Sequence, residues 1–286
     1  MKPTLQAAIL AIGIFTSLIP TPALASFPEA VAAQARGDYA SALKLYRIEA
    51  QQGHIEAHTN LGLLYEKGNG VAQDYKEAAK WYRLAADKGS AAAQNYLGLM
   101  VEDGVGVKQD YKEATKWYRL AAEQGYAAAQ INLGVAYMNG VGLPQDKAEA
   151  MRWYLRAAEQ GDANGQYNMA LAYSRGYGVQ QDFKEAVKWY RLAAANGHAS
   201  AQNNLGTMFT TGRGIPANRV LAYALFNLSA ISDPSRENKA AANRNGLAAS
   251  MSAQDIESAK ELTLELKQPG NLLKVLDAQS SAPVAN

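Results

Sequence analysis

A 36-residue internal repeat constrains the fold of this chain more than any other feature of its sequence. Four tryptophans stand 36 residues apart, and a tyrosine directly follows each of them. They are Trp81, Trp117, Trp153 and Trp189. Glycines keep the same interval, in one series that includes Gly89, Gly125 and Gly161 and in Gly-x-Gly pairs that recur from Gly68 onward. Self-similarity at a fixed period is typical of solenoids, whose repeats stack on their neighbours.

Each repeat is predicted to contain two α-helices joined by a glycine turn. In residues 90–125, Ala93, Leu97 and Met100 recur at the spacing of one helix face, which predicts a first helix over 91–103. A Gly-x-Gly turn and a second helix follow. The fold is therefore predicted to be all-α, a right-handed α/α superhelical solenoid of 36-residue helix-turn-helix repeats.

The second helix of each repeat has a predicted start and end. Asp110 precedes this helix, and its carboxylate can accept hydrogen bonds from N–H groups of the first turn. Glu113 stands three residues later, which predicts a capping box with Asp110. Gly125 is suited to the left-handed conformation that ends many helices. Equivalent acidic pairs recur in other repeats: Asp74 and Glu77, Asp146 and Glu149, Asp182 and Glu185.

The large and small residues that recur at the 36-residue interval are predicted to form the structural framework. Trp117 and Leu97 are expected to fill the space between hairpins, while Gly98 and Ala114 allow neighbouring backbones to approach. The other interpretation of the Trp-Tyr pairs is an aromatic cage or a stacking platform. Their strict phase favours a role in core packing for Trp81, Trp117, Trp153 and Trp189, together with Gly89, Gly125 and Gly161.

Composition excludes several functional classes. The chain has no cysteine, which excludes a disulfide scaffold, a thiolate zinc site, an iron–sulfur cluster and a cysteine nucleophile. Its 28 Lys and Arg residues against 26 Asp and Glu residues give a net charge of +2. Nucleic-acid-binding domains usually carry a strong basic excess, so no nucleic-acid partner is expected.

The repeat pattern resembles the Sel-one-like repeat (SLR) family, a relative of the tetratricopeptide repeats. The resemblance rests on Ala-Gln-x-Asn-Leu-Gly at 201–206, on Tyr-Met-Asn-Gly-Val-Gly at 137–142 and on Lys-Trp-Tyr at 188–190. It implies five full repeats over 54–232, preceded by a partial repeat over 27–53. Residues 233–267 look like the helical cap of bacterial members, and 268–286 are predicted to be a flexible tail.

The N-terminus has the pattern of a secretory signal peptide over residues 1–25. Lys2 precedes an apolar run from Leu5 to Ile19, and Ala23-Leu24-Ala25 supplies small residues for cleavage. The alternative is an N-terminal anchor helix, but the apolar run is short for a membrane span. The sequence thus predicts a periplasmic or secreted protein with no membrane insertion after cleavage.

No catalytic residue, metal or cofactor is predicted. His54 and His58 are four residues apart, which could suggest a metal, but His58 occupies a position held by glutamine in the other repeats. The Gly-x-Gly turns follow helices and lack the lysine of a phosphate-binding loop. A basic row on the second helices is interpreted as a solvated face: Lys80, Lys116, Arg152 and Lys188.

The tetratricopeptide resemblance implies that the first helices line a concave surface. The predicted partner-binding residues there are Asn95, Glu102, Ile131, Met138, Tyr167, Ser174, Arg175 and Asn203. These positions vary between repeats, as expected of a surface that contacts different parts of one ligand. The alternative is that they vary simply because exposed positions change without a binding role.

The predicted function is that of an exported, monomeric, non-enzymatic scaffold that binds a protein or peptide in envelope assembly, signalling or host interaction. The alternative is a cell-envelope enzyme or a protein that binds cell-wall fragments or β-lactams.

Overall fold

The computed structural model describes residues 26–235 and 238–281, and every regular element within them is an α-helix. The predicted signal peptide lies outside these residues. The helices are α1 (Phe27–Ala35), α2 (Tyr39–Gln51), α3 (Ile55–Lys67), α4 (Tyr75–Asp87), α5 (Ala91–Asp103), α6 (Tyr111–Glu123), α7 (Ala127–Asn139), α8 (Lys147–Glu159), α9 (Ala163–Arg175), α10 (Phe183–Ala195), α11 (Ala199–Thr211), α12 (Arg219–Ser232), α13 (Ala240–Ala248), α14 (Ala253–Leu266) and α15 (Asn271–Ser281).

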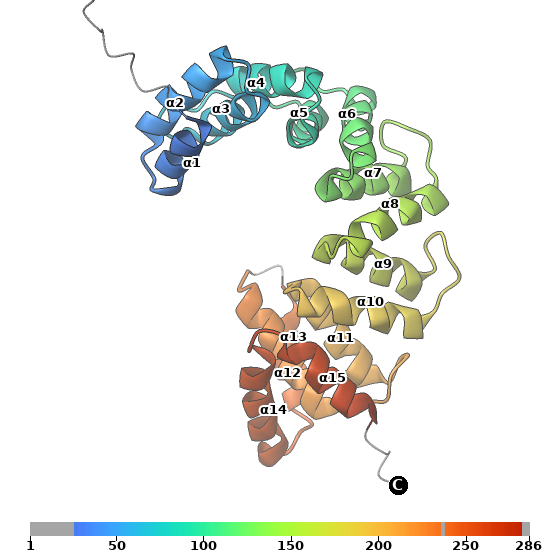
Figure 1. Cartoon of the computed structure of the whole chain (residues 1–286). Helices are drawn as coiled ribbons and strands as arrows, with labels where there is room; N and C mark the ends of the chain where they lie inside the picture. Colours follow the sequence, from blue (N-terminus) through green and yellow to red (C-terminus); the bar gives the residue numbers. More distant parts are fainter. Residues whose placement is uncertain (1–25, 236–237, 282–286) are drawn as a thin grey trace, which may run out of the picture.

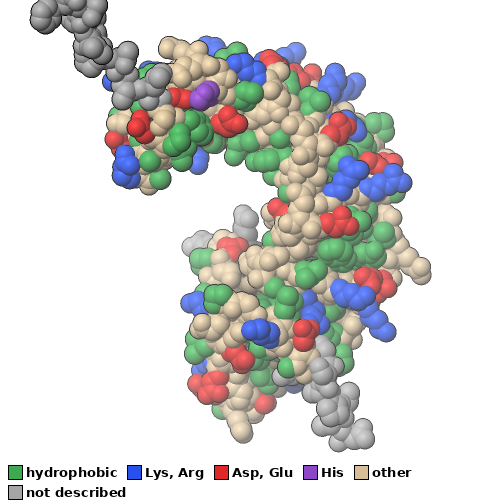
Figure 2. Space-filling view, in the orientation of Figure 1, with side chains coloured by type: hydrophobic (Ala, Val, Ile, Leu, Met, Phe, Trp, Pro, Cys, Tyr) green, Lys and Arg blue, Asp and Glu red, His purple; other side chains and the backbone are tan. Residues whose placement is uncertain are grey.

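The helices stack in chain order into an arc, which confirms the predicted α/α solenoid (Figure 1). Each helix from α2 to α12 packs on the one before it and the one after it. The first helices α7 and α9 of neighbouring repeats also contact each other directly. This contact places the first helices on the inner side of the arc, where neighbours are closest, and the space-filling view shows that side hollowed (Figure 2). Within the part of the chain that is described, no helix has the length and apolarity needed to cross a bilayer.

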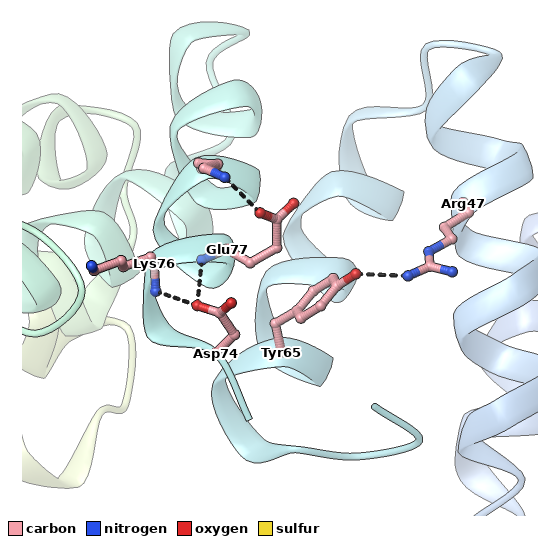
Figure 3. Close-up of polar contacts among 6 residues, drawn as sticks. Arg47, Tyr65, Asp74, Lys76 and Glu77 are labelled. Carbon is pink, nitrogen blue, oxygen red and sulfur yellow. Dashed lines mark hydrogen bonds and ion pairs between the residues drawn. The ribbon is translucent and has the colours of Figure 1, made fainter. Parts of the chain in front are cut away.

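Aspartates cap the second helices as predicted. The Oδ1 atom of Asp74 accepts hydrogen bonds from the backbone N–H groups of Lys76, at 2.9 Å, and Glu77, at 3.0 Å (Figure 3). Asp110, Asp146 and Asp182 make the same pair of bonds. The side-chain oxygen satisfies N–H groups that have no partner within the helix, which stabilises its first turn.

The predicted capping box is wrong for these helices. The backbone N–H of Asp110 already donates to the Val101 carbonyl oxygen at 3.0 Å, so the Glu113 side chain has no free donor to reach. Glu113 instead accepts from the Arg83 guanidinium at 2.7 Å and from the Trp117 indole at 3.2 Å. The bond from Arg83 lowers the pKa of the Glu113 carboxyl below its usual range. The glutamate therefore links one repeat to the next.

We expect Asp110→Ala to lower the free energy of unfolding by about 1 kcal/mol, because two N–H groups of α6 lose their acceptor. Urea unfolding followed by circular dichroism measures the change. Asp110→Asn is the matched control, since its amide oxygen can still cap the helix. An equal loss in both variants would mean that the carboxylate acts through charge and not as a cap.

Tyrosines, more than tryptophans, form the centre of the core. Tyr118 is 1% exposed, whereas Trp117 is only partly buried. A Cβ atom added to Gly98 would lie 2.6 Å from the Tyr118 ring. Gly98 therefore makes room for a ring of its own repeat and not, as predicted, for a neighbouring backbone. Of the four framework tryptophans, Trp153 is buried and the other three pack at the edge of the core.

The C-terminal part is more ordered than the sequence predicts. Residues 27–53 form the helix pair α1 and α2, and the predicted cap contains α13 and α14. The flexible tail predicted over 268–286 is wrong for 271–281, which form α15. This helix buries Leu272 and Leu276 against α10 and α14, and its Asp277 forms an ion pair with Arg191. Residues 282–286 lie outside the described part.

Candidate interaction groove

A cavity of about 360 Å³ opens between the first and second full repeats. Its wall combines the end of α3, the start of α4, one face of α5 and the following turn. The lining residues are Glu66, Tyr75, Tyr96, Leu99, Met100, Asp103 and Val105. Two carboxylates and two phenol rings thus surround an otherwise apolar floor.

The same cavity recurs in register along the solenoid. Three repeats later, a cavity of about 300 Å³ is lined by the counterparts of all seven residues: Ser174, Phe183, Asn204, Thr207, Met208, Thr211 and Arg213. A smaller cavity, about 210 Å³, lies between the third and fourth repeats beside Met138 and Lys147. Another of about 330 Å³ lies between the fifth repeat and α13. We call this series of cavities, with the faces of α3, α5, α7, α9 and α11 that line them, the groove.

The structure brings several predicted residues to the groove. Met138, Ser174 and Arg175 line its cavities. Glu102 holds the position equivalent to Met138 and accepts a hydrogen bond from the Tyr118 hydroxyl.

The other predicted residues lie deeper or are engaged within the protein. Tyr167 stacks on His198, with ring centroids 4.3 Å apart. Ile131 is partly buried against the core around α8, and Asn203 accepts from Asn243 at 2.8 Å. Asn95 is only 3% exposed and accepts a hydrogen bond from the Asn132 amide at 2.9 Å, so it lies beneath the surface of the groove.

The sequence-based prediction missed the contribution of the turns and of the second helices. Tyr75 and Phe183 begin second helices, and Arg213 follows a first helix, yet all three line cavities. The prediction counted only positions on the first helix. A usable signal was present, because the position of Tyr75 holds Lys147, Phe183 and Arg219 in the last three repeats.

The strongest pKa shifts belong to the core tyrosines. Burial, together with a 2.5 Å hydrogen bond to Glu66, raises the pKa of Tyr82. Burial and a bond to Glu102 do the same for Tyr118, and burial alone raises the pKa of Tyr154 to about 12. The shifted group recurs at one position of the first four full repeats, which indicates packing and not a single chemical site.

The histidines and the basic row have ordinary structural roles. His58 is buried, its Nδ1 atom lies 2.8 Å from the His54 carbonyl oxygen, and its ring packs against Trp81. Residues 26–235 and 238–281 contain no group of three potential metal ligands. Lys80 and Arg152 are solvent-exposed and pair with glutamates three residues earlier.

Comparison with known proteins identifies the repeat. The Sel1 repeat model matches residues 55–90, 91–126, 127–162, 163–198 and 199–233, one residue later than the predicted units. A solved Sel1 repeat protein from Oxalobacter formigenes is 32% identical, with a TM-score of 0.72 over 82% of this chain and 94% of that one. The immunity protein Pa5087 from Pseudomonas aeruginosa is 22% identical, with a TM-score of 0.51 over 72% of this chain and 84% of that one. This second likeness shows a shared fold alone. No curated protein matches the chain significantly.

Proposed function

The chain belongs to the Sel1 repeat family, and on that premise we propose that it is a non-enzymatic scaffold that holds a protein or peptide partner in the groove. The recurrence of one cavity in register, with a constant framework and a changing lining, carries this proposal. A constant framework fixes the spacing of the cavities, while the changing lining lets each cavity contact a different part of one partner.

We propose further that the protein acts outside the cytoplasm, in the periplasm or after secretion, as a monomer. The pattern of Lys2, the apolar run and Ala23-Leu24-Ala25 supports export. Envelope assembly, signalling and host interaction are the settings in which an exported scaffold of this kind would work.

The enzyme alternative has weaker support. Sel1 repeats form a scaffold fold, and the strongly shifted titratable groups here are tyrosines of the repeated core. Turnover of cell-wall fragments or β-lactams by the purified protein would favour that alternative.

We expect Val135→Asp to abolish partner capture. Val135 is 40% exposed and occupies the position held by cavity residues Leu99 and Thr207 in other repeats. The full-length chain with a C-terminal tag is expressed in its own cells, and the proteins it captures are identified by mass spectrometry. The same spectra show whether the chain begins at Ser26, as cleavage of the signal peptide requires.

Leu120→Asp is the matched control. Leu120 is 46% exposed near the end of α6 and lines none of the cavities of the groove. The two variants introduce the same charge at similar exposure, so a stability effect should be similar in both. Capture that survives Val135→Asp, or is lost equally in both variants, would contradict the proposal.

A further inference from the structure

We propose that the groove is electrically polar along its length and takes an extended peptide in one direction, with a basic side chain in the cavity at Glu66 and Asp103 and an acidic side chain in the cavity at Arg175 and Arg213. This inference rests on the proposed function and adds to it the chemistry and orientation of the partner.

The polarity follows from four repeated positions, namely the last two residues of the first helix, the middle of the Gly-x-Gly turn and the start of the second helix. In the first two full repeats these positions hold three acids and one lysine: Glu66, Glu102, Asp103 and Lys67. In the last three repeats they hold four bases and no acid: Lys147, Arg175, Arg213 and Arg219. The sign of the charge therefore reverses along one continuous surface.

The N-terminal cavity is suited to a cation. The Tyr82 hydroxyl donates to the Glu66 carboxylate, which fixes that carboxylate at the cavity wall. The Tyr96 ring stacks on Tyr82, with centroids 5.2 Å apart, and also lines the cavity. Aromatic faces and carboxylates together attract an ammonium or guanidinium group.

The acids of this cavity lack an internal counter-ion. Across residues 26–235 and 238–281, no Lys, Arg or His side chain forms an ion pair with Glu66 or Asp103, the two acids that line the cavity. Unpaired charges that line one cavity attract an oppositely charged ligand, which here is a basic side chain.

The C-terminal cavities have the opposite character. Arg175 and Lys147 both lie over the ring of Tyr177, at 5.8 and 5.4 Å, and Arg213 lies over Phe183 at 5.7 Å. These aromatic rings orient the cations without neutralising them. In the described part of the chain none of these three bases forms an ion pair with a carboxylate. Ser174, Thr207 and Thr211 line the same wall, and their hydroxyls donate to backbone carbonyl oxygens of the chain itself. The guanidinium groups are the donors that recognise a carboxylate here.

The distance between the two ends sets the length of the peptide. The two cavities are three repeats apart. If each repeat advances by roughly the 10 Å between packed helices, the span is on the order of 30 Å. Extended chain rises about 3.3 Å per residue, so about nine residues separate the basic from the acidic side chain.

A random 12-residue peptide library, displayed on phage and selected on the full-length chain, tests this inference. We expect enriched peptides to carry Lys or Arg toward one end and Asp or Glu toward the other, in one order. A synthetic peptide of the consensus sequence then gives a dissociation constant for each variant. We expect roughly a tenfold loss of affinity for Glu66→Gln with Asp103→Asn, and a similar loss for Arg175→Gln with Arg213→Gln. Higher salt should weaken binding to the wild-type chain and have less effect on either double variant.

The controls separate this inference from the proposed function. Lys80→Gln with Lys188→Gln removes the same amount of charge from the exposed face of the second helices and should leave affinity unchanged. Enriched peptides that lose binding on Val135→Asp but show no segregation of charge would overturn the polarity while leaving the groove in place. Failure to enrich any peptide, or self-association of the chain through these residues in analytical ultracentrifugation, would also overturn it. Charge reversal, Arg175→Glu with Arg213→Glu, should convert the preference at that end alone from acidic to basic residues.

Discussion

Tyr118→Ala is expected to lower the free energy of unfolding by about 3–5 kcal/mol, the range for removing a large buried side chain. The ring fills the space above Gly98, and its hydroxyl donates to Glu102. Its loss leaves a cavity within the second repeat, and the stability of a solenoid depends on each repeat and on its interfaces with its neighbours. Urea unfolding followed by circular dichroism measures the effect.

Two further variants test the physical reason for that loss. Tyr118→Phe keeps the ring and removes only the bond to Glu102, so it should cost about 1 kcal/mol. Trp117→Ala should cost less than Tyr118→Ala, because the indole is only partly buried. A larger loss at Trp117 would show that the tryptophans, as the sequence pattern suggested, form the centre of the core.

The 36-residue repeat pattern predicts some structural features of the chain and not others. Phase identifies the positions that carry the fold, so the helix pairs, the aspartate caps and the glycine turns followed from Asp110, Gly125 and their counterparts. The repeat interval does not show which of two adjacent residues is more buried, because Trp117 and Tyr118 recur at the same interval. Which of the two is more buried depends on the direction of each side chain. The tyrosine ring occupies the space that a Cβ atom on Gly98 would fill.

The features outside the repeat were harder to predict for a related reason. The helix α15 follows a Gln-Pro-Gly segment and does not keep the repeat pattern. The repeat therefore gave no prediction that Leu276 would be buried. In the groove, the first-helix positions were anticipated through Met138, Ser174 and Arg175. Tyr75 and Arg213 were missed because they reach the cavities from other elements, and only the stacking of adjacent repeats brings them there.

The stacking itself depends on the second glycine of each turn, and we expect Gly142→Ala to lower the free energy of unfolding by about 3–4 kcal/mol. Gly142 has φ +71°, and an added Cβ would lie within 2.5 Å of the Tyr111 carbonyl carbon in the preceding repeat. Backbone atoms cannot rotate away from this contact, so the substitution should separate the second and third repeats. Small-angle X-ray scattering should then show a larger radius of gyration.

Gly125→Ala is the matched control for this substitution. Gly125 has φ +88°, but no atom lies within 4 Å of its added Cβ, so this variant incurs only the conformational cost of about 1–2 kcal/mol. The difference between the two variants measures how much the close approach of neighbouring turns contributes to the solenoid. Equal losses with an unchanged radius of gyration would show that both glycines serve backbone conformation alone. A greater loss at Gly142 would mean that the spacing of the cavities, and with it the length of peptide that the groove can accept, is set by contacts between main chains.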